Sequence, residues 1–205
     1  MILYMHPENP QARAISQAVE ILRKDGILVY PTDSSYAFCC MIGNQQGMER
    51  IRRIREVDDD HFFSLVCRDL SELATYAMVD NSQYRLLRAV LPGPYTFVLK
   101  GSKDIPKKLL TPKRKTIGLR VPDHQITKDL LEALGEPLLS TTVTLPNYSA
   151  EDLREIYQIE DLLEKRVDAI IDAGDCSHSP TTVIDLTSGV PEIIREGAGP
   201  IDIFI

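Results

Sequence analysis

Residues 27–42 read Ile-Leu-Val-Tyr-Pro-Thr-Asp-Ser-Ser-Tyr-Ala-Phe-Cys-Cys-Met-Ile and place two apolar runs on either side of a polar connection. The first run, 27–30, is rich in β-forming residues and lies between Gly26 and Pro31, which is typical of a buried strand. Pro31 has no N–H group to donate to a sheet, so it ends this strand. The second run, 37–42, returns the chain to the core. The stretch therefore predicts two core strands joined by a short polar segment.

The connecting residues 32–36 put five side-chain hydroxyl or carboxylate groups in a row. Polar groups pinned between two core strands are held rigidly, which favours the binding of a small ligand. The alternative is an ordinary turn, in which Asp and Ser side chains bond to their own backbone. This stretch alone leaves both interpretations open.

Helical and strand patterns alternate along the whole chain without a fixed period. We predict helices over 10–25, 47–55, 80–91, 125–134 and 149–166, a short helix after Asp69, and further strands over 64–67, 95–100, 116–121, 138–142, 169–172, 182–186 and 192–195. Some connections are too short for helical crossovers, so the sheet is expected to be mixed in direction. No linker divides the chain, which predicts one α/β (α+β) domain over residues 1–205.

The composition is that of a soluble globular protein, with 43% hydrophobic and 26% charged residues. The first five residues are too few for a signal-peptide core, and no apolar run approaches ~18 residues, so we expect a cytoplasmic protein. The four cysteines show no paired spacing. They are interpreted as reduced, mostly buried thiols, and neither a disulfide nor a metal site is expected.

The charge distribution is more informative than its sum. The net charge of −7 argues against a general nucleic-acid binder. Between Lys100 and Arg120, however, eight basic residues stand against one acid, Asp104, and four arginines gather over residues 50–55. The pattern predicts a cationic region that attracts phosphates. For residues 100–115 a solvated surface loop is the alternative.

Hydroxyl residues recur next to several predicted strands. They occur at residues 32–35, at Ser140-Thr141-Thr142 and at Pro180-Thr181-Thr182, and two further strands carry Arg120 and Arg195 near their ends. Hydroxyl and guanidinium groups suit a ligand with carboxylate and phosphate oxygens, although Thr is also simply a good strand former. There is no Walker loop, no GxGxxG and no GxSxG. Any catalysis would therefore rest on positioning and electrostatics.

Together these segments resemble the YrdC-like family of threonylcarbamoyl-adenylate synthases, and in particular its YciO branch. The resemblance is carried, in family order, by Pro31-Thr32-Asp33-Ser34-Ser35-Tyr36, Arg53-Ile54-Arg55, Leu91-Pro92-Gly93-Pro94-Tyr95-Thr96, Thr116-Ile117-Gly118-Leu119-Arg120, Ser140-Thr141-Thr142-Val143-Thr144, Pro180-Thr181-Thr182-Val183-Ile184-Asp185 and Arg195-Glu196-Gly197. These motifs cover nearly the whole chain. Each alone is weakly specific, but their number and order are strongly specific.

The resemblance implies a YrdC-like fold, which is a twisted mixed sheet with a large concave basic cavity. It implies an activity that joins threonine, bicarbonate and ATP into threonylcarbamoyl-AMP and pyrophosphate for tRNA modification. Mg²⁺ would accompany the ATP, with no tightly bound cofactor and no metal ligands of the protein's own. The family cavity is also linked to binding of double-stranded RNA and tRNA.

The resemblance also implies roles for individual residues. Thr32, Arg120, Thr142 and Thr181 would hold the amino-acid part, with Cys67 at the position where the family commonly has a histidine. Arg53 and Arg55 would be the catalytic pair facing the ATP phosphates, and Arg55, Thr116, Thr144 and Arg195 would surround the nucleotide. Positions i and i+2 of a helix do not share a face, so the two arginines can act together only if their helix ends between or just after them.

Three departures from the family pattern bear on activity. Active synthases usually carry Lys-x-Arg and Ser-x-Asn where this chain has Arg53-Ile54-Arg55 and Thr142-Val143-Thr144, besides the histidine replaced by Cys67. A planar guanidinium does not replace a compact ammonium, and losing one transition-state donor can cost roughly 10²–10³ in rate. We therefore expect binding of ATP, AMP or an acyl-adenylate to survive better than synthase activity, which would be weak or diverged.

The alternative function is a double-stranded RNA-binding or tRNA-binding protein without synthase activity. Its phosphate contacts would come from the basic residues of 100–115 and from the arginines of 50–55. The RNA-binding residues predicted within 100–115 are Lys107, Lys108, Lys113, Arg114 and Lys115. Binding through many phosphates weakens steeply with salt, whereas binding of a small ligand depends on salt only mildly.

Overall fold

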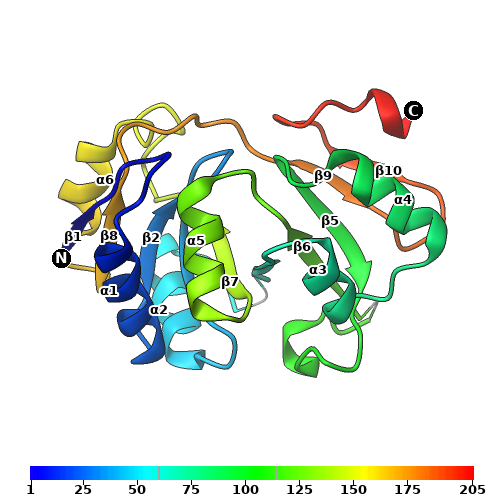
Figure 1. The fold of residues 1–205 in the computed structure, drawn as a ribbon, viewed down its shortest axis with the longest axis horizontal. Coiled ribbons are helices and arrows are strands. Elements are labelled where there is room, and N and C mark those ends of the chain that lie inside the picture. Colours follow the sequence, from blue (N-terminus) through cyan, green and yellow to red (C-terminus); the bar gives the residue numbers. More distant parts are fainter. Residues whose placement is uncertain (60, 114) are drawn as a thin grey trace.

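The computed structural model describes residues 1–59, 61–113 and 115–205, and over these residues ten strands form one mixed sheet (Figure 1). The spatial order is β1-β8-β2-β3-β7-β4-β6-β5-β9-β10. The strands are β1 (Ile2–Tyr4), β2 (Leu28–Pro31), β3 (Tyr36–Met41), β4 (Ser64–Val66), β5 (Tyr95–Lys100), β6 (Thr116–Arg120), β7 (Leu138–Thr142), β8 (Ala169–Asp172), β9 (Thr182–Asp185) and β10 (Glu192–Arg195). This confirms the predicted single α/β domain with a twisted mixed sheet.

Six α-helices and two short 3₁₀ helices accompany the sheet in the described part of the chain. They are α1 (Ala12–Arg23), α2 (Gln45–Arg55), α3 (Leu70–Tyr76), α4 (Asn81–Val90), α5 (Gln125–Leu134), α6 (Ile156–Leu163), η1 (Lys107–Leu109) and η2 (Asp202–Phe204). Several helix ends follow local chemistry: Asp69 and Asp80 accept backbone N–H groups at the starts of α3 and α4, and Gly135 ends α5 in a left-handed conformation.

Residues 27–42 contain the hairpin β2–β3. Its strands pair antiparallel, with Leu28 opposite Cys39 and Pro31 opposite Tyr36. Every residue of β2 is buried, and Pro31 is the last residue of that strand, as predicted. Parallel pairing of β8 with β2 and antiparallel pairing of β7 with β3 place the hairpin inside the sheet.

Two hydrophobic clusters cover opposite faces of the sheet. On one face, α1 and α5 lie side by side over the half that contains β1, β8, β2 and β3, and contribute residues such as Leu22 and Leu130 (Figure 1). The larger cluster covers the other face and includes Ile51 of α2, Leu73 of α3 and Ile159 of α6. The alternation of side chains along each strand therefore sorts the residues into two layers.

Two details differ from the sequence prediction. Strand β1 was not predicted, since its three residues carry no alternation long enough to detect. The helix predicted over 149–166 is wrong in length, because α6 spans only Ile156–Leu163. The hydroxyl and backbone N–H of Ser149 donate to the Asp152 carboxylate at 2.7 Å, a local arrangement that competes with helix formation.

The four cysteines are free thiols, and Cys39, Cys40 and Cys67 are buried, in agreement with the prediction. Burial raises the pKa of these three thiols. Over the described residues, no helix combines the length and the apolar character needed to cross a bilayer.

Leu65 in the middle of β4 is fully buried and tests the packing of the sheet centre. Leu65→Ala removes atoms from a closed layer and leaves a cavity, so we expect it to lower the free energy of unfolding by about 2–5 kcal/mol. The matched control is Val190→Ala at a side chain that is 70% exposed, with an expected change within about 0.5 kcal/mol. Urea denaturation measures both, and equal effects would contradict the described packing.

Candidate functional site

Helices α1 and α5 cover one half of one sheet face. A cavity of about 420 Å³ lies on the other half of that same face. The strand register explains this position: Cys39 lies opposite Ser140, Ser140 opposite Ser64, and Ser64 opposite Gly118. Side chains of directly opposite residues point to the same face. Cys39 is packed beneath the helices, whereas Ser140 and Ser64 line the cavity. One face therefore changes along the sheet from apolar and covered to polar and hollow.

The residues next to Ser140, Ser64 and Gly118 along their strands leave the floor of this cavity open, because their side chains point away from it. Leu139, Leu65 and Leu119 point to the other face, where they are buried in the core. Gly118 lies between Ser64 and Thr96, and a Cβ atom there would meet Ser64 Oγ at 3.0 Å and Thr96 Cγ2 at 3.1 Å. The missing side chain thus leaves room between two hydroxyl residues.

The turn after β2 uses its own hydroxyl groups. Thr32 is 1% exposed, its hydroxyl donates to the Ser35 carbonyl at 2.6 Å, and it accepts the N–H groups of Ser34 and Ser35 at 3.2 Å. Thr127 of α5 donates to the Pro31 carbonyl at 2.9 Å. The turn is therefore rigid, and its threonine is part of the scaffold.

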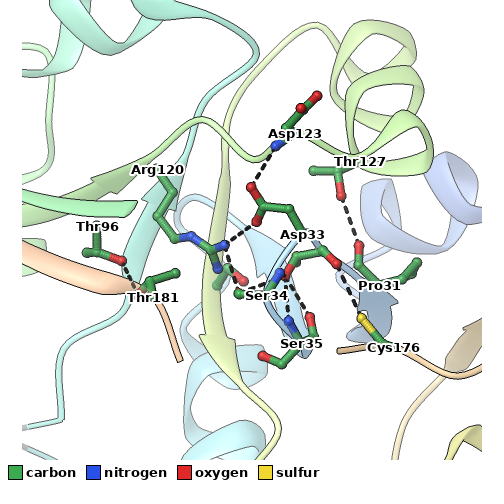
Figure 2. Close-up of polar contacts among 12 residues, drawn as sticks. Pro31, Asp33, Ser34, Ser35, Thr96, Arg120, Asp123, Thr127, Cys176 and Thr181 are labelled. Carbon is green, nitrogen blue, oxygen red and sulfur yellow. Dashed lines mark hydrogen bonds and ion pairs between the residues drawn. The ribbon is translucent and has the colours of Figure 1, made fainter. Parts of the chain in front are cut away.

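Asp33 of this turn forms a buried ion pair with Arg120 at the end of β6 (Figure 2). Arg120 Nη2 lies 2.9 Å from Asp33 Oδ1 and 3.1 Å from Ser34 Oγ, and the Asp123 N–H donates to Asp33 Oδ2 at 2.8 Å. The two side chains are only 6% and 9% exposed. Arg120 is thus held at one nitrogen and lines the cavity.

The Nε atom of Arg120 is buried and has no hydrogen-bond partner among the described atoms. A buried guanidinium N–H without an acceptor is costly, so such a group calls for an explanation. An anionic oxygen bound in the cavity would supply the missing acceptor.

A second arginine of the cavity wall, Arg195, comes from β10, which pairs with β9. Arg195 lies opposite Val183, and its Nε and Nη2 donate to the Thr181 carbonyl at 3.1 and 2.8 Å. The Thr181 hydroxyl lies 2.8 Å from that of Thr96 on β5 (Figure 2). Desolvation, followed by the proximity of Arg120, lowers the pKa of Arg195. The two guanidinium groups are therefore close enough to influence one another.

The third arginine of the cavity wall is Arg55, the last residue of α2. Its Nε and Nη2 donate to Thr144 Oγ1 at 2.9 and 2.8 Å, and its Nη1 donates to Thr141 Oγ1 at 2.7 Å and contacts His61 Nε2. Strand β4 begins at Ser64, which lies opposite Ser140, so Thr141 has no partner residue on β4. Arg55 of α2 therefore reaches the Thr141 hydroxyl. Burial lowers the pKa of Arg55.

The structure brings six of the predicted residues together around the cavity: Arg55, Arg120, Thr142, Thr144, Thr181 and Arg195. Four others do not line it. Thr32 and Cys67 are buried, Thr116 pairs with Thr111 at 2.8 Å, and Arg53 is exposed. Helix α2 does end just after Arg55, yet only Arg55 reaches the cavity, because the two side chains leave the helix in different directions. The roles assigned to all of these residues stay predictions.

Two histidines and one aromatic residue line the cavity without having been predicted: His61, His178 and Phe62. Scattered histidines offer no spacing that would identify them, and only the fold shows their place. Nδ1 of His178 is buried and has no partner among the described atoms.

The lining contains three arginines and, among the described residues, no aspartate or glutamate. Asp33, which is outside this lining, pairs with Arg120 and offsets its charge. The basic character of the cavity therefore stays a prediction. No group of three His, Cys, Asp or Glu residues suited to a metal ion occurs in the described ranges. The donor set therefore does not fit a protein-bound Mg²⁺, which prefers carboxylate and phosphate oxygens.

The predicted RNA-binding lysines lie outside the cavity lining. Lys107 and Lys108 belong to η1 and are exposed, as are Lys113 and Lys115 in the following loop. Arg114 is outside the described residues. Contact with RNA stays a prediction.

The fold and site define this chain as an α/β protein with an open mixed sheet and a polar cavity, which is lined by arginines from three separate elements. The chain belongs to the Sua5/YciO/YrdC family, whose model, described as "Telomere recombination", matches residues 20–197. This confirms the resemblance seen in the sequence.

Individual relatives agree with this assignment. The YciO protein of Escherichia coli strain K12 is 55% identical over 204 residues, which cover 98% of each chain. The crystal structure of E. coli YciO matches with a TM-score of 0.93 and 54% identity, and covers 100% of this chain and 99% of that one. A threonylcarbamoyl-AMP synthase of Vibrio vulnificus strain YJ016 is 27% identical over 188 residues, or 89% of this chain and 98% of that protein.

A more distant structure, P. abyssi Sua5 complexed with L-threonine, is 22% identical with a TM-score of 0.83. The match covers 98% of this chain and 59% of that chain, and at this identity it shows the shared fold.

The ion pairs of Arg120 and Arg50 form a matched comparison of burial. Asp33→Ala leaves the Arg120 charge buried without its carboxylate, so we expect a loss of about 3–5 kcal/mol in the free energy of unfolding. Arg50→Ala breaks the Arg50–Asp168 pair, whose side chains are 39% and 38% exposed, and should cost about 0–1 kcal/mol. Chemical denaturation measures both, and a small effect at Asp33 would show that Arg120 is not held as described.

Proposed function

We propose that the protein binds an acyl-adenylate, or its ATP and amino-acid precursors, in the arginine-walled cavity. The observation that carries this proposal is Arg120, a buried residue of the cavity lining that Asp33 fixes at one nitrogen and whose Nε has no partner among the described atoms. Arg120 would bind the carboxylate of an amino acid such as threonine, because a guanidinium group pairs well with a carboxylate. The threonine complex of the P. abyssi relative supports this ligand class.

The other two arginines suit the nucleotide part. Arg195 and Arg55 reach the cavity from β10 and α2, so phosphate oxygens between them would meet donors from two sides. Hydroxyl groups of Thr141, Thr142 and Thr181 complete the polar wall. A cavity of about 420 Å³ is within the size range of small-ligand sites. Mg²⁺ would enter with the ATP phosphates, since the described lining offers it no carboxylate.

The same geometry supports weak or diverged synthase activity, as proposed from the sequence. Arg53, which stands at the family's lysine position, is exposed and does not line the cavity. Thr144, which stands at the asparagine position, is engaged by Arg55. The name of the V. vulnificus relative indicates the reaction from which this chain would have diverged. Binding of structured RNA is less favoured, because the arginines converge on a cavity of nucleotide size whereas the exposed lysines lie outside it.

Loss of the cavity arginines tests the ligand class. Arg195→Ala and Arg120→Ala should each remove most of the increase in melting temperature that ATP or threonylcarbamoyl-AMP produces, because stabilisation follows ligand affinity. Differential scanning fluorimetry measures the shift. Arg85→Ala, at an exposed arginine of α4 outside the cavity lining, is the matched control and should keep the full shift.

An unchanged ligand shift in both cavity variants would overturn the assignment. The Arg195 variant is decisive if Arg120→Ala itself lowers stability, because Arg195 lies at the sheet edge and pairs only with backbone and hydroxyl oxygens of Thr181 among the described contacts.

Phe62 tests where the base of the nucleotide lies. Its ring lines the cavity and is 39% exposed, which leaves a face free for stacking. Since stacking of a base on an aromatic ring contributes about 1–3 kcal/mol, Phe62→Ala should weaken ATP binding about tenfold and leave pyrophosphate binding unchanged. Isothermal titration calorimetry measures both ligands, and Phe62→Tyr should restore the affinity for ATP. Equal losses for ATP and pyrophosphate would place the base elsewhere.

A further inference from the structure

His61 lies in the loop between α2 and β4 and meets the cavity beside Arg55. Its Nε2 contacts Arg55 Nη1 and lies 3.1 Å from Thr141 Oγ1. An arginine can only donate, so the Nε2 atom must be unprotonated and accept this bond, and the ring proton is then on Nδ1. The Thr141 hydroxyl accepts from Arg55 and lies within hydrogen-bond distance of the same Nε2 atom.

The contacts of Arg55 show what this acceptor does. Two of its nitrogens bond to Thr144, and the third bonds to Thr141 and His61. These partners surround the guanidinium group in its plane, so its direction at the cavity wall is fixed. Without His61, one of the N–H groups turned away from Thr144 would lose its acceptor, and the side chain would gain freedom to rotate.

We propose that His61 is a positioning residue that, as a neutral imidazole, holds Arg55 in place for an anionic ligand in the cavity. The identity of the ligand in this inference rests on the proposed function. The coupling between His61 and Arg55 can be measured without any ligand. It gives the histidine a role that neither the family motifs nor the sequence pattern indicated.

The surroundings of His61 favour the neutral imidazole. Among the described residues, the charged groups that face it are Arg55 and Arg52 of α2. Arg52 also donates to the His61 carbonyl and lies over the ring of Phe63, and the imidazole makes an edge contact with that same ring. Burial, then Arg55, then Arg52 lower the pKa of His61 to about 4. The imidazole is therefore neutral near pH 7 and able to accept.

A double-mutant cycle tests the coupling. Without ligand, His61→Ala and Arg55→Ala should lower the melting temperature by less in combination than the sum of the single changes, because each removes the same bond. With ATP, His61→Ala should weaken binding about five- to tenfold in the wild-type background and by less than twofold in the Arg55→Ala background. Additive losses in stability and in affinity would overturn the proposal.

Rescue and pH separate positioning from simple packing. His61→Gln keeps an acceptor and should bind ATP within about twofold of wild type. Unfolded histidine titrates near 6.5, so as pH falls from 6.5 towards 4 the unfolded state takes up a proton that the native state refuses, and wild-type stability falls. The melting temperature of His61→Gln should fall less over this pH range than that of wild type, with a remaining contribution from His124, whose pKa is also lowered by burial. His6→Gln, at an exposed histidine near the N-terminus, should show the full fall.

The two failures can be told apart. If ATP stabilises no variant, wild type included, the proposed ligand class is wrong, and the stability cycle still decides whether His61 and Arg55 are coupled. If ATP binds but His61→Gln is as weak as His61→Ala, the acceptor role is wrong.

Discussion

The buried ion pair between Asp33 and Arg120 connects parts of the sheet that are otherwise separated. Asp33 follows β2 and Arg120 ends β6, and β3, β7 and β4 lie between those two strands. Two charges with so little exposure need each other, because a buried charge without a partner is strongly destabilising. The pair therefore fixes the polar turn against the wall of the cavity, while the Nε of Arg120 has no hydrogen-bond partner among the described atoms.

The sheet register extends this constraint to the rest of the site. The polar residues Ser140, Ser64 and Thr96 share one face because strand pairing aligns them, and Gly118 keeps the space between them open. Arg195 lies on that face because it pairs with Val183. Side chains alternate between the two faces along each strand, and on this face the alternation places polar residues next to an otherwise apolar layer. The cavity forms at those polar residues. The small anionic ligand that we propose is inferred from this arginine-lined geometry and from the family relationship.

Local sequence patterns predicted most of the elements, since apolar alternation, Pro31 and Gly135 act over a few residues. The order of the strands could not be predicted, because it depends on pairing between distant segments such as β2 and β8. Strand β1 was missed for the same reason: its three residues become a strand only against β8. The motif resemblance supplied six of the residues around the cavity but could not distinguish Arg55 from Arg53, which differ only in the direction in which they leave the end of α2. His61 gave no signal because its importance comes from its contact with Arg55.

We propose that an anionic oxygen of the bound ligand accepts a hydrogen bond from Arg120 Nε, which has no partner among the described atoms, and ¹⁵N NMR of arginine Nε–H groups tests this pairing most directly. On addition of L-threonine and ATP, we expect the Arg120 Nε–H signal, assigned by its loss in Arg120→Lys, to shift and to become protected from exchange with water, while the signal of exposed Arg85 stays in place. An Arg120 signal that is unchanged at saturating ligand would contradict the account.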